Sequence, residues 1–150
     1  MSKAEDEARS VRAIVALYRE FERVARDADI SLAQYRTMLY LRSGAKRAGA
    51  IAAAGAVKKP TVSAMLNNLR DKGWIADEAD PADARAISVK LTRAGLKRMA
   101  AFEAALAARV AQAAPSVRLD GFHAALAEVY VGMAESREDR RKDIEKSFLE

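Results

Sequence analysis

Residues 49–69, GAIAAAGAVKKPTVSAMLNNL, decide how this chain of 150 residues folds. A small residue at Ala52 allows two short helices to cross closely, and Pro60 suits a first helical turn, where its missing N–H leaves no bond unmade. The apolar residues of the second helix recur at helical spacing and are expected to pack against the first helix: Val57, Val62, Met65, Leu66 and Leu69. The spacing predicts a helix-turn-helix, with helices over 49–55 and 59–72. An ordinary pair of packed helices remains the alternative at this point.

The stretch that follows, DEADPADARAISVKLTRAG at residues 77–95, reads as a β-hairpin. Residues 86–91 alternate apolar and polar side chains, which is the period of a half-buried strand, and residues 74–76 are the expected partner. Asp80-Pro81 is a turn signal between them. A hairpin with a charged tip directly after a helix-turn-helix predicts a winged helix, in which that tip is the wing.

The outward face of the second helix is expected to be small and polar, so this helix would fit into a major groove. Lys58 and Lys59 stand at its N-terminus, where free N–H groups and the helix dipole also favour phosphate. The candidate DNA-contacting residues of this helix are Lys58, Lys59, Pro60, Thr61, Ser63, Ala64, Asn67 and Asn68.

Charge is unevenly distributed along the chain. Residues 31–98 hold 13 Lys/Arg and 5 Asp/Glu, a net of +8, whereas residues 1–30 have a net of −1 and residues 99–150 a net of −2. No Asp or Glu occurs in residues 30–70. A block of one sign favours a polyanion partner over a face kept basic for solubility.

Several classes of protein are not supported by the composition. The chain has no cysteine and a single histidine, His123, which argues against a metal site. No carboxylate pair, nucleophile–base set or Gly-rich phosphate loop is present, so neither an enzyme nor a cofactor is expected. Neither a membrane-spanning run nor a signal peptide is seen, so a cytoplasmic protein is expected.

The flanking segments predict helices. Capping boxes at Ser2/Glu5 and Ser31/Gln34 mark two helix starts, and Thr92 marks a third helix that ends before Pro115. A last helix is expected from about Asp120 into the charged tail. The first helix and the last two are apolar on one face, and a small winged-helix core cannot bury all of these faces. The residues expected as excess helical surface are Phe102, Leu106, Val110, Phe122, Leu126, Val129, Tyr130, Met133, Ile144, Phe148 and Leu149.

Three segments together resemble the MarR family of bacterial transcription regulators: SLAQYRTMLYL (31–41), AIAAAGAVKKPTVSAMLNNLRDKGWI (50–75) and DPADARAISVKLTRAG (80–95). The family's D-x-R pair at the wing corresponds here to Asp83 and Arg85. The resemblance implies that Arg85 enters or borders a minor groove, with Asp83 orienting its guanidinium. Ala64 departs from the pattern, because relatives often carry a long basic side chain there. Readout is therefore expected to shift towards Asn67, Thr61, Ser63 and DNA shape.

The resemblance implies a mainly helical chain with a small β-hairpin wing. Residues 1–150 would form one unit, with a DNA-binding part over 31–91 and dimerisation helices in 1–30 and 92–150. It further implies a homodimeric repressor on a pseudo-palindromic duplex, relieved by a small, often anionic aromatic effector. Candidate ligand contacts are Tyr18, Tyr35, Met38 and Tyr40, each of which also fits a plain core role. A winged-helix protein- or RNA-binding module without ligand response is the alternative.

Overall fold

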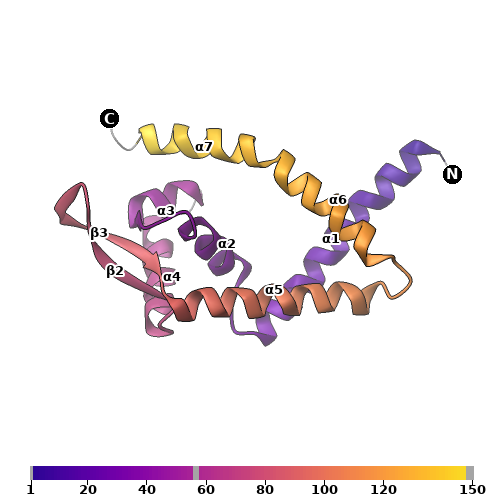
Figure 1. Ribbon diagram of the computed structural model, residues 1–150, viewed down its shortest axis with the longest axis horizontal. Coiled ribbons are helices and arrows are strands. Elements are labelled where there is room, and N and C mark those ends of the chain that lie inside the picture. Colours follow the sequence, from indigo (N-terminus) through magenta and orange to yellow (C-terminus); the bar gives the residue numbers. More distant parts are fainter. Residues whose placement is uncertain (1, 56–57, 148–150) are drawn as a thin grey trace.

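A computed structural model describes residues 2–55 and 58–147, and Figure 1 shows its mainly helical architecture. The elements in chain order are α1 (Lys3–Asp27), α2 (Leu32–Leu41), β1 (Lys46–Arg47), α3 (Ala48–Ala54), α4 (Lys59–Asp71), β2 (Ile75–Asp80), β3 (Asp83–Leu91), α5 (Arg93–Ala113), α6 (Leu119–Gly132) and α7 (Ala134–Ser147).

Local capping sets three helix starts, as predicted. The Ser2 and Ser31 hydroxyls accept the backbone N–H of the residue three positions later, at 3.3 and 3.0 Å. In both cases the side chain of that later residue, Glu5 or Gln34, accepts the cap's own N–H and completes a capping box. Thr92 caps α5 by accepting the Gly95 N–H at 3.0 Å.

The helix-turn-helix is formed by α3 and α4, which pack against each other. Ile51 and Ala52 of α3 are buried, as are Val62, Leu66 and Leu69 of α4, while Met65 is half-buried. The predicted apolar face of the second helix is thus confirmed for these residues of α4. The expected contribution of Val57 lies outside the described residues.

The wing is a three-stranded antiparallel sheet in the order β1-β3-β2. Its two long strands extend further than predicted, because β2 reaches Asp80 and β3 begins at Asp83, which leaves Pro81 and Ala82 as the turn. Most of the expected tip therefore lies in paired strands. The strand β1 was not predicted: its two residues are too few to show a period, and they are extended because they pair with Ser88 and Val89.

The C-terminal region is divided into two helices, which corrects the single last helix expected from the sequence. The chain breaks at Met133, directly after Gly132, a residue of low helix propensity. The Arg137 guanidinium donates to the Tyr130 carbonyl at 2.7 Å and lies over the Tyr130 ring at 4.0 Å. The Arg137 side chain thus provides a hydrogen bond to a backbone carbonyl near the helix break.

The apolar residues of the flanking helices fall into two groups. Phe102 and Val110 are buried in the chain's own interior, contrary to the expectation that they are surplus surface, because α5 packs against α1 and α2. By contrast, α6 contributes no buried residue, and α1 buries only Ala25. The side chains that remain exposed include Val11, Ile14, Val15, Tyr18, Leu126, Val129, Tyr130, Val131 and Met133. Phe148 and Leu149 lie outside the described residues, as does the side chain of Ile144.

Candidate nucleic-acid interface

The outward face of α4 carries the residues that the sequence nominated. The buried positions Val62, Leu66 and Leu69 hold one side of the helix against the core, which directs the other side to solvent. All eight candidate side chains at this helix are exposed: Lys58, Lys59, Pro60, Thr61, Ser63, Ala64, Asn67 and Asn68. The structure therefore brings them together on one accessible face.

The N-terminus of α4 is basic and lacks a side-chain cap. Lys58 is the N-cap residue, and among the described residues no side chain makes a capping bond to this helix start. Neither Lys58 nor Lys59 forms an ion pair with a residue that the structure describes. Free N–H groups, the positive end of the helix dipole and two lysines favour an anion at this point.

The two asparagines near the other end of α4 have different surroundings. The Asn68 carboxamide oxygen accepts the Gln34 side-chain N–H at 2.7 Å, so Asn68 joins α4 to the start of α2. The Asn67 carboxamide oxygen accepts from Arg70 Nη1 at 2.9 Å. Arg70 in turn pairs with Asp77 of β2, with its Nη2 at 2.8 Å from the carboxylate. Sequence reasoning missed Arg70 and Asp77 at the site.

Two acidic residues at the wing turn, Asp80 and Asp83, lie against an arginine of β1. Arg47 Nε donates to Asp80 Oδ2 at 2.7 Å, and Asp80 also accepts from the Ala82 N–H at 2.8 Å and from the Ser88 hydroxyl at 3.0 Å. The Arg47 bond is the main cause that holds the pKa of Asp80 well below its usual range, followed by the Ala82 N–H. This cluster ties the wing turn to the start of α3. The only sequence signal for Arg47 as the partner of Asp80 was its place in the basic block of residues 30–70.

Asp83 and Arg85 lie at the wing turn, and both are exposed. The Asp83 carboxylate accepts the backbone N–H of Arg85 at 3.0 Å and lies 4.0 Å from Arg47 Nη2. The contact between Asp83 and Arg85 is therefore with the backbone, not with the guanidinium as the sequence analysis expected. Within residues 2–55 and 58–147 the Arg85 guanidinium forms no ion pair, so it points to solvent unengaged.

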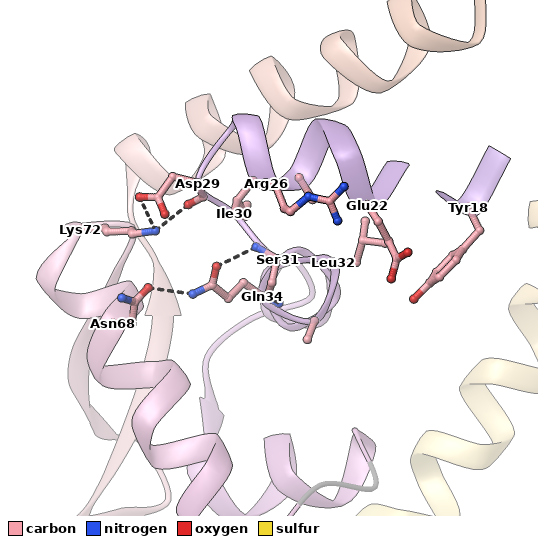
Figure 2. A pocket seen from close by; sticks show the side chains of 12 residues that line it. Tyr18, Glu22, Arg26, Asp29, Ile30, Ser31, Leu32, Gln34, Asn68 and Lys72 are labelled. Atoms are coloured by element: carbon pink, nitrogen blue, oxygen red, sulfur yellow. Dashed lines mark hydrogen bonds and ion pairs between the residues drawn. The ribbon is translucent and has the colours of Figure 1, made fainter. Parts of the chain in front are cut away.

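The candidate ligand contacts are divided between a surface cleft and the core. A surface cleft of about 660 Å³ lies between α1, α2 and the end of α4. Tyr18 lines it together with Glu22 and Arg26, as Figure 2 shows. Lys72 closes one end by pairing with the Asp29 carboxylate at 3.0 Å (Figure 2). Met38 and Tyr40 are instead core residues, both buried.

Tyr35 is half-buried and also belongs to the packing of the interior. Its ring makes an edge contact with Phe102, with ring centroids 5.2 Å apart, and its hydroxyl donates to Glu103 at 2.8 Å. Burial raises the pKa of the Tyr35 hydroxyl, and the bond to Glu103 adds to the increase. Tyr35, Met38 and Tyr40 do not line the cleft that Tyr18 lines.

A helix-turn-helix followed directly by a paired β-hairpin defines a winged helix-turn-helix protein. Residues 28–86, which hold α2 through the start of β3, match the sequence profile of the MarR family. Over this segment the chain is similar to the MarR family, and its winged helix fold is the one found in solved structures of MarR-family regulators.

Solved structures share this fold over most of the chain. A point mutant of S. aureus MepR bound to an oligodeoxyribonucleotide is 21% identical, with a TM-score of 0.62 over 90% of this chain and 99% of that one. YusO from Bacillus subtilis is 22% identical, with a TM-score of 0.66 over 89% and 99%. The transcriptional repressor CouR, bound to a 23-mer DNA duplex, is 22% identical, with a TM-score of 0.60 over 80% and 86%. No curated protein matches the chain.

Two further findings concern the described residues. No helix among them is long and apolar enough to cross a membrane. Nor do three His, Asp or Glu side chains within those residues gather where they would hold a metal ion.

Proposed function

We propose that this protein is a dimeric transcription regulator that binds double-stranded DNA sequence-specifically. It acts as a repressor, and a small ligand releases it from the DNA. The observation that carries the proposal is the outward face of α4, where eight candidate side chains are exposed beside an uncapped basic helix start. The DNA-bound MepR and CouR structures share the fold and support the choice of duplex DNA as partner.

In the proposed complex, α4 lies in a major groove and the wing reaches the flanking minor groove. Lys58 and Lys59 contact phosphates, while Thr61, Ser63 and Asn67 face base edges, with Pro60 and Ala64 allowing close approach. Asn68 borders this surface, although its carboxamide oxygen is engaged by Gln34. Arg85, with an unengaged guanidinium, is the minor-groove residue, and Asp83 fixes the backbone that carries it.

The exposed apolar faces of α1 and α6 support the dimer. Val11, Ile14 and Tyr18 on α1 are 54–62% exposed, and Val129 and Tyr130 on α6 are 55% and 59% exposed. Large apolar side chains gathered on an exposed helix favour a protein interface. We assign residues 1–30 and 92–150 to dimerisation and 31–91 to DNA binding. A two-fold dimer would present two α4 helices roughly 34 Å apart, matching half-sites about 10 bp apart.

The cleft lined by Tyr18 is the proposed effector site, because it lies between a dimerisation helix and the winged helix (Figure 2). A ligand wedged there would change the angle between α1 and the helix-turn-helix, and thus the spacing of the two α4 helices. Tyr35, Met38 and Tyr40 would act behind this cleft as packing residues.

Selection of bound fragments from random duplex DNA, followed by footprinting, tests the proposal. Enrichment of a pseudo-palindrome with half-site centres about 10 bp apart is expected. Lys58→Ala and Lys59→Ala should weaken binding to every duplex similarly, and each should flatten the salt dependence by about one unit of slope. Preferential binding of single-stranded RNA, or a stable monomer near 16.3 kDa in light scattering, would refute the proposal.

Two variants separate base reading from shape reading. Asn67→Ala should relax the preference at one base position, by about 1–3 kcal/mol. Arg85→Ala should lose most affinity on sites with A·T-rich flanks, whose narrow minor groove attracts arginine, and much less on G·C-rich flanks. The melting temperature of each variant is the control, since both side chains are exposed and wild-type values are expected.

A further inference from the structure

The wing and the recognition helix are joined by a relay of three side chains, Asp77, Arg70 and Asn67. Arg70 Nε and Nη2 converge on one oxygen of Asp77, at 2.9 and 2.8 Å. Arg70 Nη1, on the other edge of the guanidinium, donates to the Asn67 carboxamide oxygen at 2.9 Å. Since Arg70 and Asn67 belong to α4 and Asp77 to β2, the relay crosses from the wing to the face proposed to read DNA, where β2 lies against α4 (Figure 1).

The chemistry of arginine determines how Asn67 is oriented. A guanidinium only donates hydrogen bonds, so it must face the carboxamide oxygen of Asn67 and not the NH2 group. The carboxamide would otherwise be free to rotate by half a turn, because its two ends are nearly equal in size. The relay therefore sets which end of Asn67 presents a donor to a base edge and which presents an acceptor.

Asp77 is what makes this orientation persistent. Arg70 is a long side chain, and ordering its rotamers costs more free energy than a single solvent-accessible bond to Asn67 returns. The charge-assisted contact with Asp77 holds the guanidinium in place before any base arrives. Without Asp77, Arg70 would spend much of its time in other rotamers, and Asn67 would lose its fixed orientation.

We propose that Asp77 and Arg70 are positioning residues that determine the base preference read by Asn67, although neither would touch a base. The inference rests on the proposed function and adds that part of the sequence specificity resides in the wing. It also assigns a role to an acidic residue in a basic binding region. Asp77 orients Asn67 through Arg70, although its negative charge weakens the attraction to phosphate.

Glu78 supplies a matched control. It is the next residue of β2, so its side chain projects from the opposite face of the strand, where it pairs with Lys90 at 2.5 Å. Asp77→Ala and Glu78→Ala remove the same charge from adjacent positions, and both should raise affinity for all duplexes slightly. Only Asp77→Ala breaks the relay.

The experiment selects binding sites with wild type, Asn67→Ala, Asp77→Ala, Arg70→Lys and Glu78→Ala. Asp77→Ala should lose several-fold discrimination at the same base position as Asn67→Ala, without losing affinity. Arg70→Lys should do likewise, because an ammonium lacks the planar fork that spans both partners. Glu78→Ala should keep the wild-type preference. In the Asn67→Ala background, Asp77→Ala should have no further effect at that position.

A second readout needs no DNA. The side-chain NH2 resonances of Asn67 in a ¹⁵N NMR spectrum should shift in Asp77→Ala and stay in place in Glu78→Ala. Unchanged Asn67 resonances in Asp77→Ala would overturn the relay itself. Shifted resonances with an unchanged base preference would overturn its role in specificity. If the wild type selects no duplex, the proposed function fails and the specificity role falls with it, while the NMR result still decides whether the relay exists.

Discussion

Gly95, the third residue of α5, has no room for a side chain. A Cβ atom at this position would lie 2.1 Å from the Trp74 carbonyl oxygen and 3.3 Å from the Leu91 side chain. The oxygen it would strike is backbone, and it already accepts the Thr92 N–H at 3.0 Å. Gly95→Ala must therefore push α5 away from the chain segment that connects α4 to the wing.

The expected cost follows from three terms. Overpacking a tight site costs about 1–3 kcal/mol. Weakening the bond from Thr92 to Trp74 costs about 1 kcal/mol. Alanine's better helix propensity returns at most about 1 kcal/mol. Gly95→Ala is thus expected to lower the free energy of unfolding by about 1–3 kcal/mol.

Gly121 is the matched control, since it is also the third residue of its helix, α6, and a Cβ there meets nothing within 4 Å. Gly121→Ala should be neutral or stabilising by up to about 1 kcal/mol. The assay is urea unfolding of both variants and wild type at one fixed protein concentration, because the proposed dimer would couple stability to concentration. The close packing inferred for α5 would be refuted if Gly95→Ala were as stable as Gly121→Ala with an unchanged denaturant slope.

Three further outcomes are expected. Ser31→Ala removes the cap of α2 and should cost about 1 kcal/mol in urea unfolding, and no loss would mean that the bond to the Gln34 N–H is not maintained in solution. Arg47 holds the folded pKa of Asp80 below its unfolded value of about 3.9. The loss of stability in Asp80→Asn relative to wild type should therefore be largest above about pH 4 and become smaller on further acidification. Unfolding midpoints of both proteins across that range check this, and a loss that grows in acid would contradict it. Val129→Glu should weaken the dimer at least about tenfold in sedimentation, because it places a charge in the proposed interface, while the circular dichroism of the chain stays unchanged.

What the sequence determined by itself about this protein is local. The helix starts at Ser2, Ser31 and Thr92 depend on contacts between residues three positions apart, so the residue types announce them directly. The buried and exposed faces of α4 follow from the helical period, and the structure shows the predicted inward face at Val62, Leu66 and Leu69. Short range and regular period are what make these features readable without a structure.

What only the tertiary structure decided is the set of partners across the chain. Arg47 and Asp80 are 33 positions apart and meet because β1 adds to the edge of the hairpin, a pairing too short to leave a periodic signal. In the sequence Arg70 is one of several basic residues and nothing marks its partners. The packing of α4 against β2 places it between Asp77 and Asn67. In the terminal helices, too, the sequence does not tell which apolar residues are buried, since Phe102 and Val129 are both apolar residues of helices. The packing of α5 against α1 and α2 buries Phe102, whereas Val129 on α6 stays in solvent. Burial depends on which surfaces meet, and that is a property of the assembled fold and not of any local pattern.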